Sequence, residues 1–321
     1  FQADGGIGLL SSRLTLQGPI QKEKSSFIVS GRRTYIDVLA QPFMNEENAF
    51  SGSGYYFYDL TTKVNYKLSD KNRLYLSGYF GRDVFDFINS DNGIGISIPW
   101  GNATTSLRWN HLFNDKLFVN TSVIFTDYRF QFNIAQSDFE FKIYTGINDW
   151  NTKVDFLYQP NQRNTIRFGT NYTYHKFIPG NATGRSGEVE FAPDEVYTQY
   201  SNEGALYFSN DIELSDEIKA HLGLRYSSFQ YRGNITFREY IKSDLTGEND
   251  NYRNIEPRAS LRYRINTNNS IKMAFTQNYQ YIHLAYLSSL SLPADLWVPS
   301  SKDIKPKFST QYALGYFKNF N

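Results

Sequence analysis

The chain has 321 residues, of which only 40% are hydrophobic but 17% are aromatic, with 25 Tyr and 26 Phe. Its 33 basic and 32 acidic residues nearly cancel, so no basic surface points to nucleic acid. Cysteine is absent, which excludes disulfides and thiolate metal sites. No window reaches about 18 consecutive apolar residues, which excludes a transmembrane helix but not membrane strands, whose residues alternate between lipid and water.

The predicted elements are β-strands, beginning with a strand fragment at residues 1–7. The clearest signal runs from Tyr56 to Leu68, where every second residue is apolar or Thr and those between are mostly polar. A typical globular strand has about 5–6 residues. A tilted membrane strand needs about 9–11 residues within the lipid, so the length of this run favours a membrane strand.

The same alternation recurs in five later segments. These segments cover residues 117–125, 150–158, 166–174, 220–226 and 259–265. In the last segment, Arg258, Arg262 and Arg264 fall on the face opposite the apolar residues. A dry core would heavily penalise these three arginines, whereas a water-filled lumen would not. The strands are therefore predicted to have one lipid-facing side and one wet side.

The connections between these strands alternate between short and long. The short ones are rich in the Asn, Asp, Ser, Gly and Pro that tight turns prefer, and cover 18–25, 69–72, 114–116, 160–164, 215–217 and 266–269. The long ones cover 38–54, 86–100, 127–148, 177–196, 232–251 and 283–306. Short turns at one rim and long loops at the other are typical of outer-membrane barrels.

Aromatic residues gather where the strands run into the long connections. Because they lie at the same end of successive hairpins, they favour an aromatic girdle at the membrane interface over ordinary core aromatics. These residues are Tyr128, Phe130, Phe132, Tyr172, Tyr174, Phe177, Tyr226, Phe229, Tyr231, Tyr279 and Tyr281.

Together these patterns predict an all-β fold, a transmembrane antiparallel up-and-down β-barrel. We count about 13 strands, or about 14 with residues 1–7. Single-chain bacterial barrels normally have an even number of strands, and an open edge in lipid leaves unpaired backbone groups at several kcal/mol each. We therefore expect residues 1–321 to form one partial barrel domain whose closing strands lie outside this chain.

Two stretches of sequence are distinctive. One runs from Gly6 to Ile20 and continues from Lys24 to Asp37, and the other comprises Trp297 to Pro306 with Gln311 to Tyr316. They resemble the early and the middle barrel of TonB-dependent outer-membrane receptors of the Bacteroidota type. The first stretch is fairly specific, the remainder is generic barrel sequence, and the resemblance covers essentially the whole chain.

This resemblance implies a barrel of about 22 strands, of which the chain supplies about 13–14, preceded by a plug domain that this chain lacks. It implies location in the bacterial outer membrane and uptake driven by the inner-membrane proton gradient. The implied partners are outer-membrane lipids, TonB through an absent N-terminal segment, and a small-molecule, glycan or peptide ligand. A surface lipoprotein stays open as a further partner.

Few residues suggest catalysis or metal binding. The histidines His111, His175, His221 and His283 lie on different hairpins without metal-ligand spacing, and are interpreted as isolated strand or rim residues. Without Cys, the chain offers few combinations of nucleophile and base. We therefore expect no enzymatic activity, no catalytic residue, no metal and no cofactor.

The wet side of the predicted strands is the best candidate for a ligand surface. Its charged side chains either contact a ligand or solvate the lumen and pair with the plug. They are Asp59, Lys63, Arg108, Asp155, Arg167, Arg225, Arg258 and Arg262. The long connection near the C-terminus adds Tyr286 and Trp297, because exposed aromatics often mark recognition surfaces, although packing within the loop explains Trp297 equally well.

The sequence thus predicts TonB-dependent, ligand-gated transport of a scarce solute, such as a siderophore, vitamin, glycan or peptide, across the outer membrane. A passive porin, or a barrel that scaffolds an outer-membrane complex, is the alternative, and a plug would distinguish the two. A secreted soluble β-protein that binds or modifies carbohydrate comes third, because strand length and the regular alternation of turns argue against it. The sequence does not identify the solute.

Overall fold

A computed structural model describes residues 1–40, 42, 52–89, 91–191, 198–234, 250–285 and 296–320. The first strands are β1 (Gln2–Ile7), β2 (Ser11–Gln21), β3 (Ser25–Thr34), β4 (Gly54–Ser69), β5 (Asn72–Asn89), β6 (Ile94–Asn114), β7 (Leu117–Gln136), β8 (Phe139–Asn161) and β9 (Asn164–Ser186). The later strands are β10 (Val189–Phe191), β11 (Gln199–Glu213), β12 (Ile218–Asn234), β13 (Asn251–Arg264), β14 (Asn269–Gln280), β15 (Ile282–Ala285), β16 (Leu296–Pro299) and β17 (Lys307–Lys318). A short helix, α1, covers Ile36–Ala40. Among the described residues, no helix is long and apolar enough to cross a membrane.

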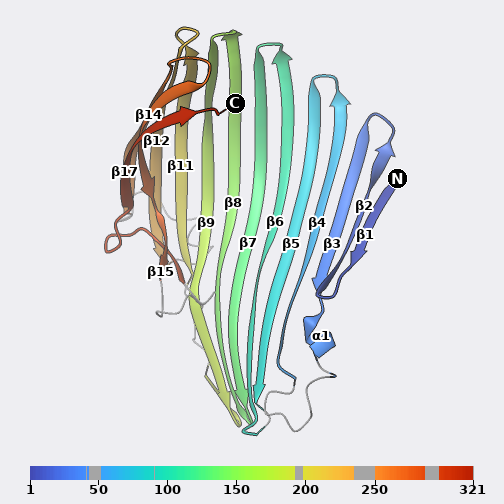
Figure 1. Cartoon of the computed structure of the whole chain (residues 1–321). Coiled ribbons are helices and arrows are strands. Elements are labelled where there is room, and N and C mark those ends of the chain that lie inside the picture. Colours follow the sequence, from blue (N-terminus) through green and yellow to red (C-terminus); the bar gives the residue numbers. More distant parts are fainter. Residues whose placement is uncertain are drawn as a thin grey trace.

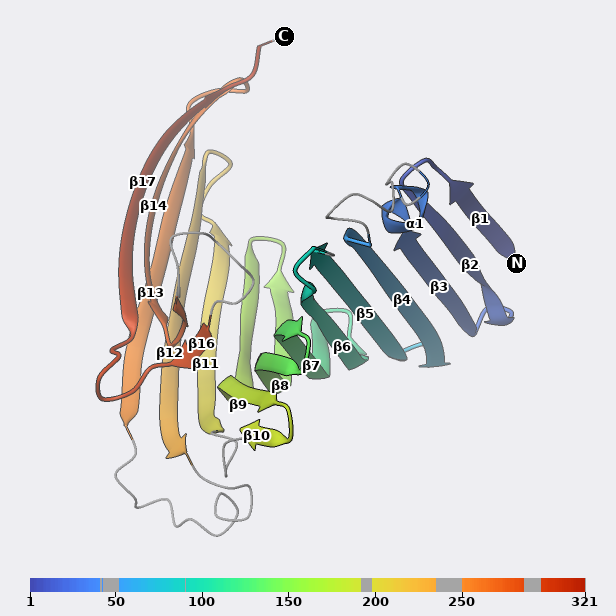
Figure 2. The same ribbon diagram turned by 90° about the horizontal axis from the view of Figure 1, so that it is seen from below.

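Most of these strands form one antiparallel sheet that follows the order of the chain. It runs from β1 to β9, then through β11 to β14, and ends at β17 (Figure 1). β10 pairs with the end of β9, and β15 pairs with β16 in a separate hairpin. The sheet curves like part of a cylinder wall, with β1 and β17 at its two edges (Figure 2). The predicted all-β, up-and-down fold is confirmed.

The strand alternation gives the sheet one apolar face and one polar face. On β4, Leu60 and Tyr66 are 45% and 40% exposed, while Asp59 and Lys63 fall on the other face. Exposed apolar side chains continue on the same face as Leu60 across the sheet: Leu76, Leu107, Val123, Trp150, Tyr172, Leu206, Leu224, Leu261 and Leu314. So extensive an apolar surface is unfavourable in water and is what contact with lipid requires.

Three of the predicted long loops are largely strand. β5 and β6 stay paired as far as Asn89 and Ile94, β7 and β8 as far as Gln136 and Phe139, and β8 and β9 as far as Phe139 and Ser186. β8 and β9 are 23 residues long, which exceeds the lipid thickness. Beyond the lipid both faces of such a hairpin meet water, so no alternation of apolar and polar residues marks the strand in the sequence.

The predicted aromatic girdle divides between the two faces. Tyr172 and Tyr226 lie on the apolar face and are exposed. In contrast, Phe177 and Phe229 are completely covered on the polar face. Phe229 stacks on Tyr281 with ring centroids 5.0 Å apart, so part of this aromatic group packs inside rather than against lipid.

The β15–β16 hairpin lies against the polar face, where β16 contacts β8 and β9. Backbone groups anchor the segment that follows it. The Ser300 amide donates to the Tyr281 carbonyl at 2.7 Å, and the Tyr252 hydroxyl donates to the Ser301 carbonyl at 2.7 Å. The Lys302 amide donates to the carboxylate of Asp250, which immediately precedes β13. The hairpin is therefore tied to the wall at several points.

Candidate functional site

On the N-terminal half of the sheet, the predicted wet-side residues interact with neighbouring strands. Asp59 accepts a hydrogen bond from Arg32 Nε at 2.8 Å. Lys63 and Arg108 both lie over the ring of Tyr75, with Lys63 Nζ 5.6 Å and Arg108 Cζ 4.8 Å from its centroid. Cross-strand ion pairs and cation–π contacts therefore hold these charges against the wall.

Asp155 and Arg167 occupy the middle of the sheet. Asp155 accepts a hydrogen bond from the Tyr207 hydroxyl, which reaches it from β11. Arg167 forms an ion pair with Asp211, whose other carboxylate oxygen lies 2.7 Å from His221 Nδ1. Each of the two predicted residues therefore has a partner of its own on a nearby strand.

Arg225 and Arg258 converge on one buried carboxylate. Glu256 is 3% exposed, and its two oxygens lie 3.7 Å from Arg225 Nε and 3.7 Å from Arg258 Nη2. Arg225 Nη2 also lies 3.8 Å from Glu203, and Arg258 donates to Asn278 at 2.8 Å. A buried carboxylate requires such compensation, because an unpaired one would be strongly destabilising.

His175 extends this arrangement across β8, β9 and β11. It is 4% exposed, its Nδ1 lies 2.7 Å from Asp149, and its Nε2 lies 3.9 Å from Glu203. Nε2 is buried without a hydrogen-bond partner. The expectation that this histidine is an isolated strand residue is therefore wrong. We call Asp149, His175, Glu203, Arg225, Glu256 and Arg258 the lumen network.

Tyr281 connects the lumen network to the hairpin. The Ser227 hydroxyl donates to Glu256 at 2.6 Å and lies 2.7 Å from the Tyr281 hydroxyl. Asn254 Nδ2 donates to the same Tyr281 oxygen at 2.9 Å. Tyr281 is the residue between β14 and β15, so these hydrogen bonds connect the network to the base of the hairpin.

A pocket of about 460 Å³ lies between the hairpin and the wall. Asp149 and Glu203 line it from the wall. Tyr279 lines it from β14, Tyr281 from the link between β14 and β15, and Trp297 from β16. Its volume falls within the roughly 300–1,000 Å³ typical of ligand sites, and its carboxylates and aromatic rings suit binding. Trp297 is therefore brought to the network, whereas the predicted Tyr286 lies outside the described residues.

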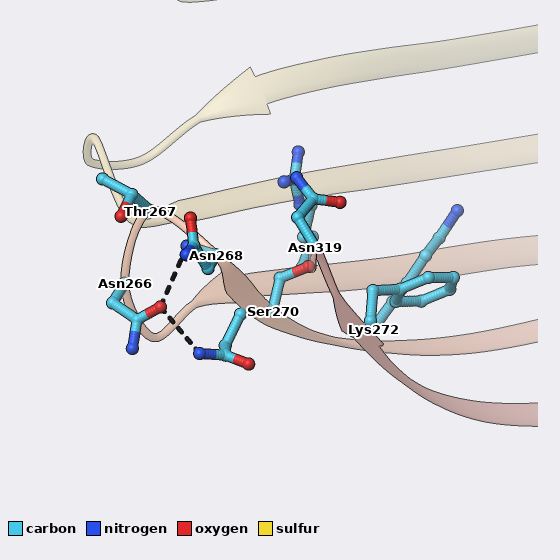
Figure 3. Close-up of a pocket in the computed structure, with 9 residues that line it drawn as sticks. Asn266, Thr267, Asn268, Ser270, Lys272 and Asn319 are labelled. Carbon is cyan, nitrogen blue, oxygen red and sulfur yellow. Dashed lines mark hydrogen bonds between the residues drawn. The ribbon is translucent and has the colours of Figure 1, made fainter. Parts of the chain in front are cut away.

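Arg262 belongs to a different place, at the short-turn end of the sheet. It is paired across strands with Lys272 and lines a pocket of about 280 Å³ around the β13–β14 turn (Figure 3). Within that turn, Asn266 Oδ1 accepts from the Asn268 amide at 3.0 Å and from Asn269 Nδ2 at 2.9 Å. Within the described part of the chain, neither Arg262 nor Lys272 has a carboxylate at ion-pair distance.

Sequence reasoning missed the acidic half of the lumen network and its histidine. Asp149, His175 and Glu203 share the wet side with the predicted arginines, but they lie above the segments where apolar alternation is clear. Every second residue of a strand shares a face, so extending the alternation from Arg167 to His175 places that histidine on the wet side. Its proximity to Asp149 depends on strand register, which the alternation leaves undetermined.

The chain matches the family described as TonB dependent receptor-like, beta-barrel over residues 34–317. No curated protein matches the sequence. Among solved structures it is similar to the ferric preacinetobactin receptor of Acinetobacter baumannii, with a TM-score of 0.63 and 10% identity over 95% of this chain and 49% of that chain. It is also similar to the ferric yersiniabactin uptake receptor of Yersinia pestis, with a TM-score of 0.62 and 14% identity over 97% and 50% of the two chains.

A copper transporter gives a TM-score of 0.66 and 11% identity over 99% of this chain and 50% of that chain. Identities this low show likeness of fold alone. The chain spans about half the length of the solved structures that it matches.

Proposed function

The chain belongs to the TonB-dependent receptor-like β-barrel family, whose members are outer-membrane proteins of Gram-negative bacteria, and we propose that it serves in TonB-dependent, ligand-gated uptake of a scarce solute. In such barrels the long connections face outward and the short turns face the periplasm. The polar face is then the lumen wall, and the apolar face meets lipid. TonB is the proposed energy-coupling partner, and a surface lipoprotein is a further candidate.

The observation that carries this proposal is the pocket between the β15–β16 hairpin and the lumen wall. The hairpin follows β14 at the extracellular end, so a solute in the pocket would meet both the wall and a segment connected to the outside. Tyr281 joins that segment to the buried network through Ser227. We propose that these shared hydrogen bonds couple ligand binding to movement of the hairpin, as gating requires.

Direct ligand contact is assigned to the pocket residues Asp149, Glu203 and Trp297. The charged residues predicted on the wet side, apart from Arg262, already have partners on the wall. We propose that these paired residues shape the lumen, and that those near the pocket orient its carboxylates. This assignment narrows the sequence-based prediction, which treated all of them alike.

Metal complexes are the first solutes to test. The solved structures named above are described as receptors for two ferric siderophores and as a copper transporter. Vitamins, glycans and peptides complete the panel, because fold likeness does not select a ligand.

The test is uptake by intact cells that carry either the whole protein or a deletion. Each radiolabelled solute is supplied with and without a protonophore that collapses the proton gradient. We expect one solute to accumulate only with the protein and only with the gradient. Trp297→Ala should reduce that uptake at least tenfold at equal surface abundance, while Trp109→Ala, on the apolar face, should not.

Uptake that continues without the gradient would contradict the proposal and favour a passive porin. If no solute of the panel is taken up in a gradient-dependent way and the protein co-purifies with a stable outer-membrane complex, a scaffold barrel is favoured. Conductance of the purified protein in a planar bilayer separates a passive porin from a plugged receptor, because a porin conducts continuously and a plugged receptor does not.

A further inference from the structure

Three arginines lie in one row across the outer, apolar face of the sheet. The cross-strand register pairs Arg33 with Tyr58, Tyr58 with Arg82, Arg82 with Gly101, and Gly101 with Arg129. The arginines thus occupy β3, β5 and β7, two strand spacings apart, which is roughly 10 Å. Tyr58 and Gly101 separate them.

The row lies at the outer border of the apolar band. Arg82 is ten residues beyond the start of β5, which corresponds to roughly 25 Å from the periplasmic end for a strand tilted by about 40°. The apolar band of such barrels is about 25 Å tall. Leu76 and Phe80 precede Arg82 on the same face and are exposed, so the surface changes from apolar to cationic at this level.

The positive charges of the row are outermost. Arg33 is 3.6 Å from Asp37 and Arg129 is 2.7 Å from Asp127, but the arginine side chains are 55% and 65% exposed and the acids only 17% and 11%. Arg82 is exposed and has no carboxylate at ion-pair distance within the described ranges. The acids therefore orient two of the guanidinium groups while the surface stays cationic.

A groove joins two of these arginines. It has a volume of about 340 Å³, and its lining includes Phe80, Arg82, Gly101, Arg129 and Tyr144. A Cβ on Gly101 would collide with the Gly81 carbonyl, so the floor between the two arginines has to lack a side chain. Asp127 also lines the groove, where it accepts hydrogen bonds from Arg129 Nε at 2.7 Å and from Asn148 at 2.6 Å.

From this geometry we propose that the row of Arg33, Arg82 and Arg129 binds the phosphorylated headgroup of a glycolipid in the outer leaflet of the membrane. A guanidinium presents two parallel donors to a phosphate, and the aromatic and aliphatic surface below the row suits the acyl chains of the same molecule. Exposed arginines are unfavourable on a lipid-facing surface unless anionic groups meet them at that depth. The site goes beyond solute uptake and does not depend on it.

The test uses the purified protein in detergent with lipid A, whose phosphates are either intact or enzymatically removed. Native mass spectrometry measures the lipid retained on the barrel. We expect intact lipid A to bind at least tenfold more tightly than the dephosphorylated form. Arg82→Gln combined with Arg129→Gln should abolish this preference, and Arg82→Lys should keep the charge but weaken binding, because the paired donors are lost.

The matched control replaces Arg73 and Arg163 by Gln, since both lie at the periplasmic end of the sheet. It should bind lipid A like the original protein. Equal binding of both lipid forms, or unchanged binding in the Arg82 and Arg129 variant, would overturn the proposal. Displacement of lipid A by millimolar inorganic phosphate would also overturn it, since the site would then be a phosphate site only. If the double variant fails to fold, each single variant answers the same question.

Discussion

At the scale of single residues, the packing of the lumen wall requires glycine at positions where an aromatic side chain crosses the neighbouring strand. Gly169 is the cross-strand partner of both Asp155 and Tyr207. The Tyr207 hydroxyl reaches across it to the Asp155 carboxylate. A Cβ on Gly169 would collide with the Val154 carbonyl and would lie 2.6 Å from the Tyr207 hydroxyl oxygen. The hydrogen bond across the strand therefore requires glycine.

We expect Gly169→Ala to displace Tyr207 and to lower the free energy of unfolding by about 1–3 kcal/mol, as overpacking usually does. Urea unfolding of the protein in detergent, followed by tryptophan fluorescence, measures this. Gly204→Ala is the control, because a Cβ there meets no atom within 4 Å. The explanation fails if the two substitutions have the same effect.

At the scale of elements, the β15–β16 hairpin rests on the wall through a buried histidine. His283 is 5% exposed, its Nε2 lies 2.9 Å from the Ser300 hydroxyl, and its Nδ1 is buried without a hydrogen-bond partner. Burial, and then the positive charge of Lys307, hold the pKa of His283 below its ordinary value of 6.5. Protonation is therefore less favourable in the docked hairpin than in a released one.

Docking of the hairpin should weaken as the pH falls. Because the docked pKa is lowered, the released state binds more protons between the docked pKa and 6.5. The contribution of neutral His283 to the docking free energy of the hairpin is fully present above pH 6.5. It is lost as the pH falls through the pKa that His283 has in the docked hairpin. Hydrogen exchange of β15 and β16, corrected for intrinsic rates, measures this loss. His283→Gln should abolish the pH dependence, and His111→Gln, at the periplasmic end, should leave it intact.

The sequence predicted the membrane part of each strand and not the elements above it. Alternation requires lipid on one side, so Tyr56 to Leu68 was recognisable, whereas the outer halves of β7 and β8 were not. The hairpin was missed because β15 and β16 are four residues each and cover a wall that only the fold assembles. The alternation of residues along a single strand was enough to place the arginines on the wet side. The position of Glu256 between Arg225 and Arg258 depends on the register between strands, which the alternation does not give.

At the scale of the whole molecule, the described part of the sheet ends at β1 and β17, and each of these two strands has one unpaired edge. β17 pairs with β14 along all twelve of its residues, and no other strand of the described chain pairs with its outer side. Tyr312 and Leu314 on β17 are 78% and 74% exposed, more than the apolar residues of the inner strands. Lipid cannot satisfy the backbone groups of such an edge, which cost several kcal/mol each.

We therefore expect β1 and β17 to pair with further strands in the native protein, closing a barrel around the lumen network. The intact mass of the detergent-extracted protein tests this directly. A mass more than twice the 37.2 kDa of this chain would agree with closing strands and a plug on the same polypeptide. A mass near 37.2 kDa would contradict that expectation. Closure of the barrel would then require several chains. The model of a plug-gated receptor would be replaced by that of a smaller porin or a multi-chain barrel.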